Sequence, residues 1–167
     1  MAETAESIER TVATQGWIDQ VADPVQRALH PIIHRSPSVA YVLHGDFLQH
    51  PLHAALTDVP VGAWFTAQVL DFVEVFGGSR RLRRGADAAH AVGLAGAMLA
   101  AVAGMADWST TRGEARRVGF VHAATNTVIA GLYGASLLAR RRHRRGLGIA
   151  LSSVGYGLLI FSSWLGG

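Results

Sequence analysis

The sequence predicts an all-α integral membrane protein built around a bundle of four transmembrane helices. Half of its 167 residues are hydrophobic and only 16% are charged, a balance typical of membrane proteins. Crossing about 30 Å of hydrocarbon takes about 20 helical residues. Four apolar stretches are long enough: 54–76, 86–106, 119–139 and 147–165. The second and fourth lack the charged outer stripe of a soluble bundle, which favours membrane spans.

The first 50 residues are predicted to form an interfacial helical segment, separate from a transmembrane domain at residues 51–167. Apolar residues recur at roughly helical spacing from Ile8 to Ile32, and Trp17 suits a membrane interface. Asp23 followed by Pro24 is typical of a helix start. The acidic beginning lacks the pattern of a secretory signal, so we expect no cleavage.

Arginines between the spans predict the orientation of the chain. The sequence has no lysine, and its arginines gather in GGSRRLRRG after the first span and RRRHRRG after the third. The positive-inside rule then places both bursts in the cytoplasm and both termini outside a bacterial inner membrane. The net charge of +3 does not indicate a nucleic-acid surface. The lack of cysteine excludes disulfides and cysteine-bound iron–sulfur clusters.

Each predicted span carries one face that is unsuited to lipid, and four such faces predict a polar bundle interior. In the first span, polar or aromatic residues recur every seven positions. The second has a ladder of small residues, from Gly93 to Gly104, that would let helices approach closely. The residues of the polar faces are His50, Thr57, Trp64 and Asp71, then His90, then His122, Asn126 and Tyr133, and finally Ser152, Tyr156 and Ser163.

The first and third spans resemble each other. HAALTDVPVGAW, which begins at His53, aligns without gaps with HAATNTVIAGLY, which begins at His122. A shorter match relates Gly93 to Gly155. This pattern predicts a duplicated helical hairpin whose halves run parallel in the membrane. Such symmetry would place His53 and His122 at equal depth on facing helices, as two axial ligands of one haem iron require.

The motifs HPLHAALTDVPVGAW, GMADW, GEARRVGFVHAATNTVIAGLY and LSSVGYGL, in this order, resemble a bacterial family of integral membrane proteins classed as a domain of unknown function. The hallmark of that family is HPLHP, and here Ala54 replaces the last proline. The resemblance runs from about Leu43 to the end. It implies about four membrane helices and, because some relatives carry a Rieske-type iron–sulfur domain, an electron-transfer setting. The motif positions are His50, His53, Asp58, Asp71, Asp107, Trp108, His122 and Asn126.

From these observations we expect a membrane electron-transfer protein that binds b-type haem near its outer face. His53 and His122 would ligate the iron, and Thr57 and Asn126 would orient the two imidazoles. A quinone or an iron–sulfur protein would be the redox partner. His50 and His90 are further candidates for binding a cofactor. Asp71 and His90 are alternatively expected to form a structural ion pair.

Other interpretations remain open. The chain, which offers no nucleophile or long functional loop, could be an accessory subunit of a larger membrane complex or a homo-oligomer rather than an enzyme. An outer metal site or a proton relay toward Asp71 and His90 is another alternative. The ligands of such a metal site would come from His50, His53, Asp58, Asp107 and His122. Histidines in a first helical turn also simply reach for the interface, and His30 with His34 lacks a third ligand.

Overall fold

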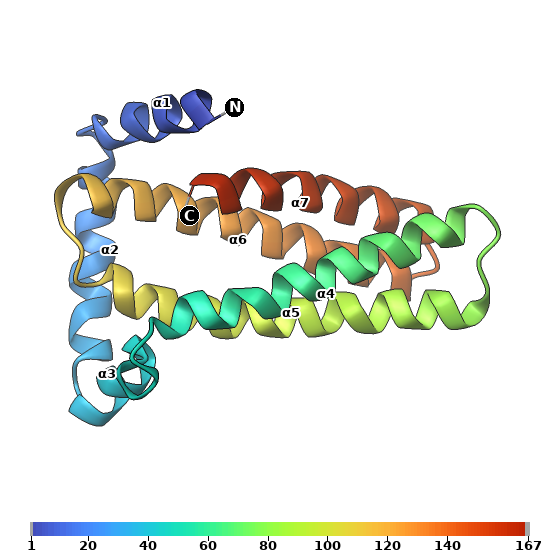
Figure 1. Ribbon diagram of the computed structural model, residues 1–167, viewed down its shortest axis with the longest axis horizontal. Helices are drawn as coiled ribbons and strands as arrows, with labels where there is room; N and C mark the ends of the chain where they lie inside the picture. Colours follow the sequence, from blue (N-terminus) through green and yellow to red (C-terminus); the bar gives the residue numbers. More distant parts are fainter. Residues whose placement is uncertain (1, 166–167) are drawn as a thin grey trace. The chain divides into compact units, whose positions relative to one another are not determined.

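The all-α prediction is confirmed by a computed structural model that describes the backbone of residues 2–165 and the side chains of residues 6–163. Within that range the chain forms helices and no strand (Figure 1). The helices are α1 (Ala2–Ala13), α2 (Ile18–Ile33), α3 (Pro37–His44), the short 3-10 helix η1 (Asp46–Leu48), α4 (Leu52–Val75), α5 (Arg80–Trp108), α6 (Gly113–Arg141) and α7 (Arg145–Leu165).

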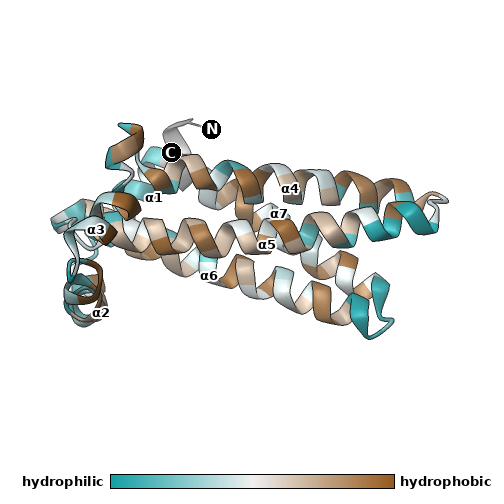
Figure 2. Ribbon diagram, turned by 90° about the horizontal axis from the view of Figure 1, so that it is seen from below, coloured by the Kyte–Doolittle hydropathy of each residue, from teal (hydrophilic) through white to brown (hydrophobic). Residues whose placement is uncertain are grey.

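The four predicted spans correspond to α4, α5, α6 and α7. By length and composition, Arg80–Trp108 and Arg145–Ser163 could cross a membrane. Helix α4 carries Asp58, Asp71 and Glu74, and α6 has charged residues at both ends, so these two helices are more polar. Figure 2 shows apolar residues along all four helices and hydrophilic residues where α5 begins and α6 ends.

The chain separates into two compact units, each with its own core. The first unit comprises Met1–Ala55, Ala100–Thr125 and Phe161–Gly167, and the second comprises Leu56–Leu99 and Asn126–Ile160. In the first unit, Ile18 and Ala22 of α2 pack with Trp108 at the end of α5. The Gln26 side chain adds hydrogen bonds to the carbonyl oxygens of Trp108 and Thr111, each at 2.9 Å. Helix α2 is therefore docked on the turn that joins α5 to α6.

The core of the second unit is centred on Trp64 of α4 and Tyr133 of α6. Their rings stack with centroids 3.8 Å apart and planes 6° from parallel. Gly93 lies directly against the Trp64 indole, and Gly155 lies against the Tyr133 ring. Because glycine has no side chain, each aromatic ring can reach the backbone of the neighbouring helix. The predicted small-residue ladder thus allows close packing between α4 and α5.

Local structure around the N-terminal segment differs from the prediction in two places. The helix start predicted at Asp23–Pro24 is wrong, because α2 begins at Ile18 and Pro24 lies inside it. Asp23 therefore lies inside the helix and cannot cap it, and its carboxylate pairs with Arg116 of α6. The heptad of the first span also loses a member, since α4 begins at Leu52 and His50 precedes it as an exposed residue.

Candidate functional site

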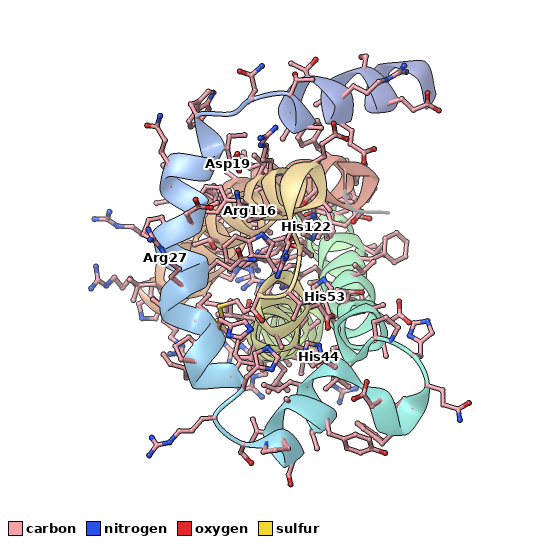
Figure 3. All side chains as sticks on the ribbon, turned by 90° about the vertical axis from the view of Figure 1, so that its left-hand side faces the viewer. Asp19, Arg27, His44, His53, Arg116 and His122 are labelled. Atoms are coloured by element: carbon pink, nitrogen blue, oxygen red, sulfur yellow. The ribbon has the colours of Figure 1, made fainter. Side chains whose placement is uncertain are left out.

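The first unit brings His53 of α4 and His122 of α6 together. Their ring centroids are 6.3 Å apart and their planes are nearly perpendicular, at 88°. Both side chains are partly buried, and Figure 3 shows them on facing helices. His53 and His122 are equivalent in the alignment of the first and third spans, and they lie close together in space. The offset between them is 69 residues, the same as between Asp71 and Arg140.

Each of these imidazoles uses its Nδ1 atom for a bond to the protein. Nδ1 of His53 lies 2.8 Å from the carbonyl oxygen of Ala100, so it carries the proton and donates. Nδ1 of His122 lies 3.3 Å from the hydroxyl of Ser162. Gly104 gives His53 its room, because a Cβ at this position would lie 2.7 Å from the same nitrogen. An imidazole held through Nδ1 has the arrangement typical of metal ligands, which bind through Nε2.

The other predicted members of the outer site are dispersed. His50 is exposed, and its Nδ1 lies 3.2 Å from the carbonyl oxygen of the next residue, Pro51. Asp58 is exposed on α4. Among the residues whose side chains are described, no group of three or more histidines and carboxylates has the geometry of a metal site. The orienting role of Thr57 and Asn126, both partly buried, stays a prediction.

Asp107 instead binds a histidine of the N-terminal segment. Its Oδ1 lies 2.9 Å from Nδ1 of His44 at the end of α3. The His44 ring stacks with that of His34 at 5.6 Å, and the His34 ring lies 4.4 Å from that of His30. The sequence spacing indicated only the pair on α2, because nothing local brings α3 back beside it.

The pKa of His34 depends on its own partial burial and on the neighbouring imidazoles. Nε2 of His34 lies 3.3 Å from the hydroxyl of Ser109, just beyond α5. Desolvation lowers the pKa of His34, and the nearby His30 and His44 lower it further because a second or third positive charge here is repelled. Within this histidine cluster, His30, His34 and His44, the surroundings of His34 therefore favour its neutral imidazole.

The second unit contains a buried network of charged groups around Asp71. Nε2 of His90 lies 3.1 Å from Oδ2 of Asp71, so the structure brings this predicted pair together. Arg140 of α6 donates to both carboxylate oxygens of Asp71, at 2.8 Å to Oδ1 and at a shorter distance to Oδ2. Asp71 and His90 are fully buried and Arg140 almost so. Burying an unpaired charge costs several kcal/mol of free energy, and the pairing of these groups offsets part of that cost.

Further groups extend the network toward the end of α6 and the start of α7. Arg140 also donates to the hydroxyls of Ser136 and Ser152, each at 3.1 Å. Arg145 donates to both oxygens of Glu74 at 2.6 Å and to Asp87 at 2.9 Å. Many of these arginine contacts thus come from the RRRHRRG burst, which sequence reasoning treated only as an orientation signal.

The sequence did contain a signal for Arg140. Extending the alignment of the first and third spans by seven residues places Arg140 opposite Asp71, at the offset of 69 that separates them. The shorter match likewise places Ser152 opposite His90. In the structure His90 binds Asp71, and Ser152 accepts from Arg140. Exchanging the two aligned hairpins therefore converts the His90–Asp71 contact into the Ser152–Arg140 contact. Equivalent positions carry complementary residues.

Two polar atoms in the same interior have no hydrogen-bond partner among the described residues. They are Nδ1 of His90 and the hydroxyl of Tyr133, both on fully buried side chains. The two rings lie 5.4 Å apart. Because Nε2 of His90 already binds Asp71, a group able to bridge Nδ1 and the Tyr133 hydroxyl would extend this network.

A third charged cluster attaches α2 to α6 within the first unit. Asp19 accepts from Arg116 at 2.7 Å and from Arg117 at 2.7 Å and 3.0 Å (Figure 3 labels Asp19 and Arg116). The hydrogen bonds from Arg117 and then Arg116 lower the pKa of Asp19 to about 2. The carboxylate therefore stays ionised, and the attachment stays intact, down to strongly acidic pH.

Long helices that bury charges and expose apolar side chains define the class of helical membrane proteins. Exposed apolar side chains in the second unit include Phe65, Phe72, Val92, Leu99, Val128, Val154 and Ile160. Residues 49–167 match a family described as predicted membrane protein (DUF2231), and the chain belongs to this family. No curated protein and no solved structure matches the chain.

Proposed function

We propose that α4, α5, α6 and α7 all cross a bacterial inner membrane, with both termini outside. The exposed apolar side chains on all four helices support lipid contact. The polarity of α4 does not oppose this arrangement, because Asp71 and Glu74 are buried and ion-paired, and the exposed Asp58 lies within the first two turns of the helix, near the proposed outer surface. The bursts GGSRRLRRG and RRRHRRG also contain exposed arginines, such as Arg81 and Arg142. These favour a cytoplasmic location for the α4–α5 and α6–α7 loops.

We further propose that this membrane protein transfers electrons through a b-type haem held between His53 and His122. The ring separation of 6.3 Å is the observation that carries the proposal. Two imidazoles this close together on facing helices would hold the iron of a haem between them, each through one ring nitrogen. A porphyrin supplies four ligands itself, so two histidines complete its iron, whereas a structural zinc ion needs four protein ligands.

The residues around the pair fit this role. The carbonyl of Ala100 fixes the tautomer of His53 so that its Nε2 carries no proton and can bind a metal, and Ser162 contacts Nδ1 of His122. The small residue Gly104 on α5 lets the His53 ring pack closely against that helix, because a Cβ there would lie 2.7 Å from Nδ1 of His53. When bound, the haem would supply one-electron chemistry, with a quinone or an iron–sulfur protein as the partner.

The test is a visible absorption spectrum of protein purified after haem-replete expression. We expect a Soret band that is lost in His53→Ala and in His122→Ala. The matched controls are His50→Ala and His143→Ala, which remove exposed histidines outside the pair and should keep the band. Colourless wild-type protein, or loss of the band in the control variants as well, would contradict the proposal.

A proton relay is a second candidate function, favoured by two fully buried side chains in the second unit that each carry an unpartnered polar atom. Nδ1 of His90 and the Tyr133 hydroxyl are buried beside the charged network centred on Asp71. A group such as water that bridged the Tyr133 hydroxyl and Nδ1 of His90 would carry a proton between them, and Nε2 of His90 would pass its own proton to Asp71. Proton flux into liposomes should then be measurable, and Tyr133→Phe should reduce it while keeping the stack on Trp64. Equal flux in wild-type protein and Tyr133→Phe would exclude this relay.

A further inference from the structure

A shallow groove runs along α5 and α6 in the second unit. It has a volume of about 390 Å³, and its lining is almost entirely apolar. Small residues create the space: Ala91 and Ala95 on α5, and Gly134 on α6. A Cβ built on Gly134 would meet nothing within 4 Å, so the groove is open at this point. Leu137 and Leu138 of α6 also line it.

Arg141 supplies the only charge among the described residues that line this groove. It is the last residue of α6, is exposed, and makes no ion pair among the described side chains. Its neighbour Arg140 forms ion pairs with Asp71 and Asp87. Of these two adjacent arginines, Arg141 is therefore the one that can bind an external anion. Arg142 and Arg144 follow, and both are also exposed without a carboxylate partner in the described part of the chain. A positive cluster thus lies next to the charged end of an apolar groove.

We propose that this groove binds one acyl chain of an anionic phospholipid and that Arg141 binds its phosphate. Apolar lining suits a hydrocarbon chain, and a guanidinium matches a phosphate in geometry and charge. From Ala91, near Arg141, to Met98, the groove extends about 10 Å along α5 at 1.5 Å per residue. Basic pockets beside membrane helices on the cytoplasmic side are the usual sites for anionic lipids. The inference rests on the membrane arrangement proposed above, but not on haem binding.

Native mass spectrometry of protein released from micelles tests the site. The probe is an equimolar mixture of phosphatidylglycerol and phosphatidylcholine. We expect wild-type protein to retain phosphatidylglycerol preferentially, by about fivefold for each arginine that contacts the phosphate. Arg141→Gln should remove that factor, and Gly134→Leu, whose side chain fills the groove, should abolish retention of both lipids.

Two matched variants control for loss of charge and for added bulk. Arg81→Gln removes another exposed arginine without an ion pair in the described structure, and Gly157→Leu adds the same side chain at another open position, on α7. Both should retain the lipid as wild-type protein does. Equal retention of the two lipids by wild-type protein, or undiminished retention by Gly134→Leu, would overturn the site. So would a wild-type dimer that Gly134→Leu dissociates, because the groove would then hold a second copy. Extraction without detergent would instead overturn the membrane arrangement itself.

Discussion

Asp71 and Arg140 form a buried ion pair at equivalent positions of the two helical hairpins. They lie 69 residues apart, which is the offset of the aligned first and third spans. His90 and Ser152, which are equivalent in the shorter match, complete the pair from α5 and α7. One half of the repeat thus contributes the acid and the other the base. These complementary residues balance charge in a buried interior.

The first prediction concerns this pair. Asp71→Asn and Arg140→Gln should each lower the free energy of unfolding by about 3–5 kcal/mol, because each leaves its former partner charged and buried. The double variant should cost clearly less than the two single effects added together, because neither charge then remains. Thermal or denaturant unfolding in detergent micelles measures all three.

Asp58→Asn is the control for that series, since Asp58 is an exposed acid on the same helix α4. It should change stability by less than about 0.5 kcal/mol. Strict additivity of the Asp71 and Arg140 effects would mean that the two side chains do not interact in the folded protein.

The second prediction compares two helical glycines in different packing environments. Gly93 lies against the Trp64 indole, whereas a Cβ on Gly131 would meet nothing within 4 Å. Gly93→Ala should therefore destabilise the protein by about 1–3 kcal/mol, because Trp64 must move out of its stack on Tyr133. Gly131→Ala should be neutral or stabilise by up to about 1 kcal/mol through helix propensity. Melting temperatures that fall equally in both variants would contradict the packing described here.

The long helices could be predicted from the sequence because hydrophobic length is a local property. The spans predicted at 54–76 and 119–139 differ little from α4 and from the apolar part of α6. The N-terminal segment was less predictable, because its helix boundaries depend on distant groups. Asp23 resembles a helix cap in sequence, but its carboxylate is taken by Arg116, which is far away along the chain. Local propensity could not reveal this competition.

The candidate site was predictable as far as the internal repeat extends. Alignment of His53 with His122 predicted that they would face each other, and their rings do lie together in the first unit. Arg140 was missed because its burst of arginines was interpreted as a topology signal, although a charged residue can serve both purposes. The contact of Asp107 with His44 was also missed, since it depends on how α3 folds back and on no pattern within either segment.

The third prediction concerns pH and the histidine cluster. Because the pKa of His34 is lowered in the folded state, the unfolded chain binds the extra proton more readily. The corresponding stability is fully present above the ordinary histidine pKa of about 6.5 and is lost as the pH falls below it. Asp19, with its pKa lowered to about 2, stays ionised throughout this range. The C-terminal part of α2, and not its attachment to Arg117, should therefore loosen first.

Hydrogen exchange measured from about pH 7.5 to about pH 5 checks this order, after correction for the intrinsic exchange rate. Protection of backbone amides near His30 and His34 should decrease in this range, while that near Asp19 should persist. His34→Gln should lose most of the pH dependence, because glutamine cannot gain the charge. Uniform loss of protection along α2 would show that the cluster does not control this part of the helix.

The fourth prediction distinguishes four membrane spans from two. The chain has no cysteine, so single cysteines can be introduced at Thr110 and at Arg142, both of which are exposed. With four spans, Thr110 lies outside and Arg142 in the cytoplasm. If only α5 and α7 crossed, the two positions would lie on the same side. A membrane-impermeant maleimide should therefore label Thr110→Cys in intact spheroplasts and Arg142→Cys only after lysis.

Each other labelling pattern has its own meaning for the arrangement in the membrane. Labelling of Arg142→Cys alone in intact spheroplasts would mean that the four helices cross in the opposite direction, against the positive-inside rule. Equal labelling of both variants would mean that α6 does not cross.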